Sequence, residues 1–179
     1  MRLDEVGGTR NSRGPLIAKR LCLLGATLGA VAIAISGFGW ITTDAEAQLP
    51  LVMPEDLDTA EGEGLYAINC ASCHGESLEG QPDWRRPGSD GRLPAPPHDV
   101  TGHTWHHADE LLFRYTKLGG RDSLAAEGVE FDSGMPGFGD RLSDTEIWTI
   151  LAFIRSTWPE REQAAQAAAT QSSLQNQGN

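Results

Sequence analysis

Cysteine and basic residues are both scarce in this chain of 179 residues. Of its three cysteines, Cys22 lies in an apolar N-terminal run, and only Cys70 and Cys73 remain elsewhere. A zinc site of four cysteines is therefore excluded within one chain. The 14 Lys and Arg against 25 Asp and Glu give a formal net charge of −11. Such an acidic surplus argues against nucleic acid or anionic lipid as a partner, and it suits solubility or a basic partner.

Strand patterns are also lacking. No apolar–polar alternation of useful length and no internal repeat occurs in the sequence. A thioredoxin-like redox pair needs a strand followed by a helix around its two cysteines, and that context is missing. The sequence therefore predicts an all-α fold.

The first 47 residues have the pattern of an export signal. Five basic residues precede the uncharged run 21–41, and the small residues of Ala45-Glu46-Ala47 follow it. The apolar run exceeds an ordinary signal and is long enough to span a membrane. Two outcomes stay open: cleavage after Ala47 yields a soluble periplasmic protein, or residues 21–41 anchor it to the inner membrane. In both, the positive-inside rule places residues 48–179 outside the cytoplasm.

The exported part divides into three segments. Residues 48–57 are rich in proline and acidic side chains and are expected to form a linker. Residues 58–158 are expected to form one small domain. Residues 159–179 are polar, and a tail without stable structure is expected beyond a frayed helical extension.

Three helices are expected inside the domain, separated by long loops at 75–102 and 121–140 that are rich in glycine. The first helix ends near Asn69. The second, over 108–118, has an apolar stripe of Leu111, Leu112, Tyr115 and Leu118. The third starts at a capping box of Ser143 and Glu146, and its apolar residues recur on one face at Ile147, Ile150, Leu151, Ile154 and Trp158.

The strongest chemical signal is the C-x-x-C-H run formed by Cys70-Ala71-Ser72-Cys73-His74. Two thiols on one helical turn can each form a thioether with a haem vinyl group, and the next residue then presents an imidazole to the iron. The run predicts one covalently attached haem c held by Cys70 and Cys73, with His74 as iron ligand. A haem would also add apolar volume to a core that is thin for a domain of this size.

A second signal is Met135-Pro136, which lies between glycines just before the last helix. A methionine in a loop that proline stiffens can hold its thioether against one face of a haem. Together with the upstream C-x-x-C-H run, this pattern predicts Met135 as the second axial ligand.

The motifs together resemble the class I (mono-haem) c-type cytochromes, the cytochrome c domain family. The matching parts are Gly62-x-x-x-Tyr66-x-x-Asn69-Cys70-x-x-Cys73-His74-Gly75, Met135-Pro136-x-Phe138 and Leu142-Ser143-Asp144-x-Glu146-Ile147-Trp148. The resemblance implies a small cytochrome c fold of three to four helices and long loops wrapped around one haem, with the first and last helices crossing. It also implies that a proline carbonyl accepts a hydrogen bond from His74, and Pro94, Pro96 and Pro97 all stay candidates for that role.

Four histidines between residues 98 and 107 depart from the simplest members of this family: His98, His103, His106 and His107. They could bind a metal such as copper, or one of them could replace Met135 on the iron. The favoured alternative gives them structural roles, in which they cap the next helix, contact haem propionates and stack on Trp105. Arg85 and Arg86 are further candidate partners for the propionates.

The resemblance implies an electron carrier, with no catalytic residues of its own, or the electron-transfer subunit of an oxidoreductase. It would pass single electrons between a respiratory donor and an acceptor, so its partners would be a dehydrogenase, an oxidase or another cytochrome. Two alternatives stay open. One is a haem enzyme or gas sensor with a labile sixth ligand, and the other is a copper-handling haem module that uses the histidines of 98–107.

Overall fold

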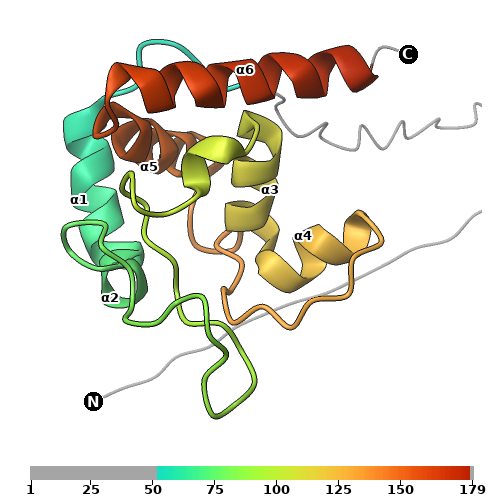
Figure 1. Cartoon of the computed structure of the whole chain (residues 1–179). Helices are drawn as coiled ribbons and strands as arrows, with labels where there is room; N and C mark the ends of the chain where they lie inside the picture. The colour runs from blue at the N-terminus through green and yellow to red at the C-terminus, as the bar shows by residue number, and fades with distance from the viewer. Residues whose placement is uncertain (1–51, 178–179) are drawn as a thin grey trace, which may run out of the picture. The chain divides into compact units, whose positions relative to one another are not determined.

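The computed structural model describes residues 52–177, which belong to one compact unit of the chain. This part is all-helical and has no strand, which confirms the predicted fold class. Its elements are α1 (Thr59–Asn69), α2 (Ala71–His74), the 3-10 helix η1 (Thr104–His106), α3 (Asp109–Leu118), α4 (Gly120–Ala126), α5 (Asp144–Ser156) and α6 (Glu160–Gln177) (Figure 1). The described part has more helices than the three to four expected.

The predicted export signal or membrane anchor at 1–47 lies outside the described residues, as does the start of the expected linker. It therefore stays a prediction. Within residues 52–177, no helix is both long and apolar enough to cross a membrane.

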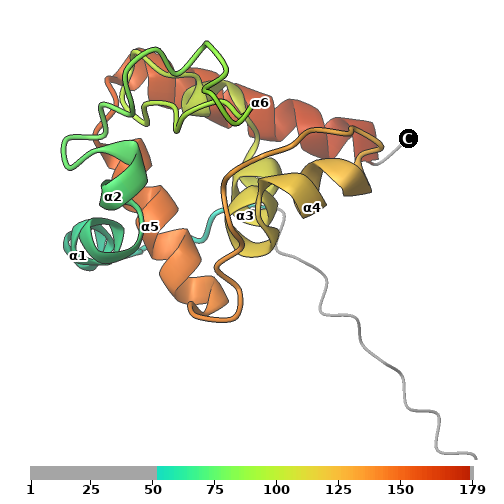
Figure 2. The same ribbon diagram turned by 90° about the horizontal axis from the view of Figure 1, so that it is seen from below.

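Helices α1 and α5 cross in close contact, and Figure 2 shows α5 running past α1, which is seen end-on. The crossing depends on Gly62. A Cβ atom at this position would lie 2.3 Å from the carbonyl oxygen of Thr149 and 2.7 Å from Cβ of Phe153. Because glycine has no Cβ, the backbone of α1 can lie directly on α5. The expected crossing of the first and last helices of the domain is thus observed.

The predicted start and buried face of α5 are confirmed. Ser143 Oγ accepts a hydrogen bond from the Glu146 N–H, and the Glu146 carboxylate accepts one from the Ser143 N–H at 2.8 Å. The Ser143 N–H, and to a smaller extent the Ser143 hydroxyl, which also donates to the Glu146 carboxylate at 2.8 Å, lower the pKa of Glu146. The five residues expected on the inner face are all buried: Ile147, Ile150, Leu151, Ile154 and Trp158.

The expected apolar stripe of α3 is not its buried face. Phe113 is fully buried and stacks on Trp148 of α5 with ring centroids 4.5 Å apart, whereas Leu118 is 40% exposed. Leu112 is only partly buried. Helical geometry places Phe113 opposite the stripe. The predicted helix is thus observed, but its most deeply buried side chain is Phe113, which contacts α5.

Helix α4 occupies the first part of the segment 121–140, which was expected to be a loop throughout. Gly119 adopts φ +87° and ends α3, and α4 begins at the next residue. A Cβ on Gly119 would lie 2.7 Å from the backbone nitrogen of Gly137. The glycine pair therefore joins two helices through a one-residue turn, where the sequence had indicated a stop followed by loop.

Residues 159–179, expected as a frayed helical extension followed by a tail without stable structure, instead form α6 over most of their length. The helix runs from Glu160 to Gln177 and lies across α3 and η1 (Figure 1). Gln166 is 1% exposed and its amide donates to the Asp109 carboxylate at 2.5 Å. Thr170 Oγ1 accepts from the Asp109 N–H at 3.0 Å. Two polar side chains of α6, Gln166 and Thr170, thus hold it against α3. Because these contacts are polar, a search for apolar periodicity does not detect them.

Candidate haem site

The C-x-x-C-H run folds into a single helical turn at the end of α1. Cys70 caps α1, and the backbone N–H of His74 donates to the Cys70 carbonyl oxygen at 2.9 Å. Both thiols are free; Cys70 is partly buried and Cys73 is exposed. Burial, and to a smaller extent the neighbouring Cys73, raises the pKa of Cys70 to about 11. The turn therefore presents two unpaired sulfur atoms and one imidazole from five consecutive residues.

The His74 ring is buried and held by a backbone carbonyl. Its Nδ1 lies 2.8 Å from the carbonyl oxygen of Pro96, so Nδ1 is the donor and Nε2 keeps a free lone pair. Of the three candidate prolines, the structure selects Pro96. Burial lowers the pKa of His74, while the hydrogen bond with Pro96 acts in the opposite direction. The site thus contains a neutral imidazole with Nε2 available as a metal ligand.

Two glycines let the loop that carries Pro96 close on α2. A Cβ on Gly80, which adopts φ +70°, would lie 2.4 Å from the backbone nitrogen of Pro97. A Cβ on Gly102 would lie 2.0 Å from the Pro97 carbonyl oxygen. Larger residues at either position would push the Pro96–Pro97 backbone away from His74.

The Met135 loop is fastened to the end of α3 and the start of α4. The Gly120 N–H donates to the Met135 carbonyl oxygen at 3.1 Å. Ser133 Oγ lies 3.1 Å from the Tyr115 hydroxyl and accepts from the Met135 N–H at 3.2 Å. Phe138, which is buried, follows as an apolar anchor. The backbone on both sides of Met135 is therefore fixed.

The predicted site residues from the two halves of the chain meet at a common core. Cys70, Leu112, Met135 and Trp105 are all partly buried and pack against the same set of buried side chains. Separate networks hold the two expected axial side chains, since Pro96 holds His74 and Ser133 with Gly120 holds Met135. A hollow of about 260 Å³ opens beside Met135 and is lined also by Arg92 and Leu118.

These residues fit a haem. The indole Nε1 of Trp105 is buried and has no hydrogen-bond partner within residues 52–177. A buried donor without an acceptor costs about 1–3 kcal/mol, and a haem propionate is an acceptor of the required kind. The stripe of α3, where Leu112 is partly buried and Leu118 is 40% exposed, offers apolar surface, and two free thiols with an imidazole supply the attachment chemistry.

The four histidines of 98–107 do not converge on one point. His103 stacks on Trp84 with centroids 5.4 Å apart, and His106 stacks on Trp105 at 3.6 Å. His98 points inward and stacks on His74. Across the described residues, no group of three or more His, Cys, Asp and Glu side chains could hold a metal ion. The expected stacking on Trp105 is observed for His106, and a copper site gains no support.

The arginines near the Met135 loop differ from those expected. Arg85 lies over the Trp84 ring, 3.9 Å from its centroid. Arg92 pairs with Asp132 at 3.0 Å, and Arg121 of α4 pairs with the same carboxylate. These two hydrogen bonds lower the pKa of Asp132. Arg92, Asp132 and Arg121 thus link the loop after α2 to the Met135 loop and to α4. The spacing of these residues in the sequence does not predict this contact.

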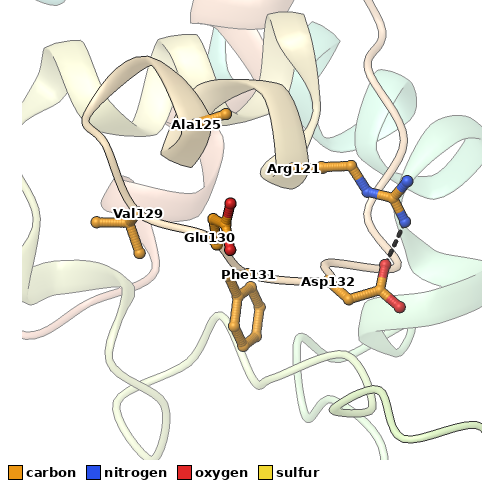
Figure 3. A pocket seen from close by; sticks show the side chains of 6 residues that line it. All are labelled: Arg121, Ala125, Val129, Glu130, Phe131 and Asp132. Carbon is orange, nitrogen blue, oxygen red and sulfur yellow. Dashed lines mark hydrogen bonds and ion pairs between the residues drawn. The ribbon is translucent and has the colours of Figure 1, made fainter.

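A larger hollow of about 510 Å³ lies beside α4 and shares Arg121 with the hollow next to Met135. Figure 3 shows Arg121 reaching Asp132 at its edge, with Ala125, Val129 and Phe131 around it. Cys70, Cys73, His74 and Met135 are all absent from its lining.

Comparisons with known proteins identify the family. A search of curated proteins and a search of solved structures each gave no significant match. The family model described as cytochrome c oxidase, cbb3-type, subunit III matches residues 57–154, which is more than half of the chain. These residues include the C-x-x-C-H turn, the Met135 loop and most of α5. The chain therefore belongs to this family of mono-haem c-type cytochrome domains, whose members transfer electrons through a covalently bound haem c.

Proposed function

We propose that this protein carries single electrons through one haem c, which Cys70 and Cys73 attach and His74 and Met135 ligate. The observation that supports this most is the hydrogen bond of 2.8 Å between His74 Nδ1 and the Pro96 carbonyl, because it leaves Nε2 free on the same turn as both thiols. A bound haem would supply an iron that changes between the ferric and ferrous states by transfer of one electron.

The protein's own residues keep the geometry of the two ligands constant. Pro96 holds the proximal imidazole, and Ser133 with Gly120 holds the backbone of Met135. With the His74 ring and the Met135 backbone held in this way, a bound iron would change its oxidation state with little rearrangement, and these two side chains would leave it no position for a substrate. Methionine opposite histidine also favours a higher reduction potential than other axial pairs.

Trp105 and Arg92 are the proposed partners of the haem propionates. The unpartnered Trp105 Nε1 is the proposed donor to one propionate. Arg92 lines the hollow beside Met135 and is the proposed partner for propionate charge, in place of Arg85, which stacks on Trp84.

The proposed place of action is outside the cytoplasm, with a respiratory oxidase as electron acceptor. The sequence of residues 1–47 supports export. The matched family is described as an oxidase subunit, which supports an oxidase as the partner. A net charge of −11 supports docking to a basic partner surface, which would weaken as salt is added.

The test is expression with a haem-attachment system, followed by intact mass and carbon monoxide titration. One haem per chain is expected, and it should be lost in the double variant Cys70→Ala/Cys73→Ala but kept in Cys22→Ala. The reduced protein should not bind carbon monoxide at neutral pH, because both axial positions are filled. Ready binding of carbon monoxide would favour a haem enzyme or gas sensor instead.

A further inference from the structure

A second histidine covers one face of the His74 ring. The centroids of His98 and His74 lie 4.0 Å apart and their planes differ by 22°. His98 comes from the loop that also carries Pro96, and the proposed function assigns it no role. Its position beside an expected iron ligand therefore needs an explanation.

His98 is fastened from three directions. Its Nδ1 lies 2.9 Å from Thr104 Oγ1 in η1. Its backbone N–H donates to the Leu78 carbonyl at 2.8 Å, and its carbonyl accepts from the Trp158 indole at 2.7 Å. The turn after α2 and the segment after α5 thus hold the backbone of His98, and Thr104 of η1 holds its ring.

The stacked arrangement excludes His98 as the ligand opposite His74. Two axial ligands point their nitrogen atoms at each other across the iron, whereas these two rings lie face to face. The ring of His98 therefore presents a flat surface to His74.

The hydrogen bond with Pro96 restrains the rotation of the His74 ring about its Cβ–Cγ bond, but hydrogen bonds tolerate a range of angles. A contact on the face of the ring narrows that range further, and His98 provides such a contact.

We propose that His98 is a positioning residue that fixes the plane of the His74 imidazole and keeps water from its face. The proposal rests on the proposed binding of iron by His74. The plane of an axial imidazole sets the anisotropy of the electron paramagnetic resonance (EPR) signal of low-spin ferric iron. Exclusion of water from the proximal side disfavours the more highly charged ferric state, so it raises the reduction potential.

The test compares three variants of the haem-loaded protein. His98→Ala should lower the reduction potential and shift and broaden the EPR signal, because the ring loses its supporting face. His98→Phe keeps a flat ring and should return both readouts most of the way to wild type. Thr104→Val removes the anchor of His98 and should give an intermediate shift.

His103→Ala is the matched control, because His103 is exposed and stacks on Trp84 rather than on His74. It should leave the EPR signal and the potential unchanged. Wild-type values in His98→Ala would overturn the proposal. If His98→Ala does not fold, Thr104→Val decides, and an unshifted signal there would overturn it equally. Absence of covalent haem in the wild-type protein would instead refute the proposed function, so the two failures are distinguishable.

Discussion

His74 and Pro96 lie 22 positions apart in the chain, yet the ring of one and the carbonyl of the other form a hydrogen bond of 2.8 Å. The bond connects α2 to the long proline-rich loop that follows it. It requires the loop to approach α2 closely. Gly80 and Gly102 allow this approach, because neither has a Cβ atom that would collide with Pro97.

Gly102→Ala is expected to weaken this bond. The new Cβ would lie 2.0 Å from the Pro97 carbonyl oxygen, so the Pro96–Pro97 backbone must move. We expect the free energy of unfolding to fall by about 1–3 kcal/mol, in the range of overpacking substitutions. Thermal or denaturant unfolding measures this, and unchanged stability would show that the loop tolerates the displacement.

Gly62 and Gly64 form a matched pair on α1. A Cβ at Gly62 would meet Thr149 and Phe153, whereas none of these contacts exists at Gly64, where no atom lies within 4 Å. Gly62→Ala should therefore destabilise by more than about 1 kcal/mol, and Gly64→Ala should stabilise by about 0.5–1 kcal/mol. Denaturant titration of both variants checks the pair. Equal effects would contradict the close crossing of α1 and α5.

Gln166→Ala should show that α6 is part of the fold. It removes the amide that donates to the buried Asp109 carboxylate, so the free energy of unfolding should fall by about 1–3 kcal/mol. Gln171→Ala, on the exposed side of α6, is the control and should stay within about 0.5 kcal/mol of wild type. If both variants match wild type, α6 does not contribute to stability.

Stability should fall as the pH drops below neutrality. Burial lowers the pKa of His103 and of His107, with neighbouring histidines adding to the effect and Arg85 contributing at His103. The unfolded chain binds protons at these rings near pH 6.5, while the folded protein resists until lower pH. Protonation therefore favours unfolding in the window below about pH 6.5.

Thermal unfolding between about pH 7.5 and 5 measures this dependence. The double variant His103→Asn/His107→Asn should flatten it, because two of the groups that take up protons on unfolding are gone. If the double variant loses stability with falling pH as steeply as the wild type, titratable groups other than His103 and His107 cause the dependence.

The elements that the sequence predicted well are those with local causes. The capping box of Ser143 and Glu146 and the apolar spacing of α5 are short-range signals, and both are observed. The C-x-x-C-H turn is local too, and its folding onto one helical turn follows from five residues.

The elements that it missed depend on distant contacts. Pro96 could not be distinguished from Pro94 or Pro97 without the glycines that bring the loop to His74. Helix α6 has no apolar stripe, and it is held by Gln166 and Thr170 against an aspartate in another helix. The inward turn of His98 likewise depends on η1 and Trp158, so the sequence alone grouped it with the other histidines of 98–107.

Ligation by Met135 is the central claim on function, because it separates an electron carrier from a haem protein with an open iron. The most direct measurement is the visible and near-infrared absorption spectrum of the oxidised, haem-loaded protein. A charge-transfer band of methionine-ligated ferric iron should be present in the wild type and in Met53→Leu, and absent in Met135→Ala. A wild-type protein that carries its haem but lacks this band would contradict the account.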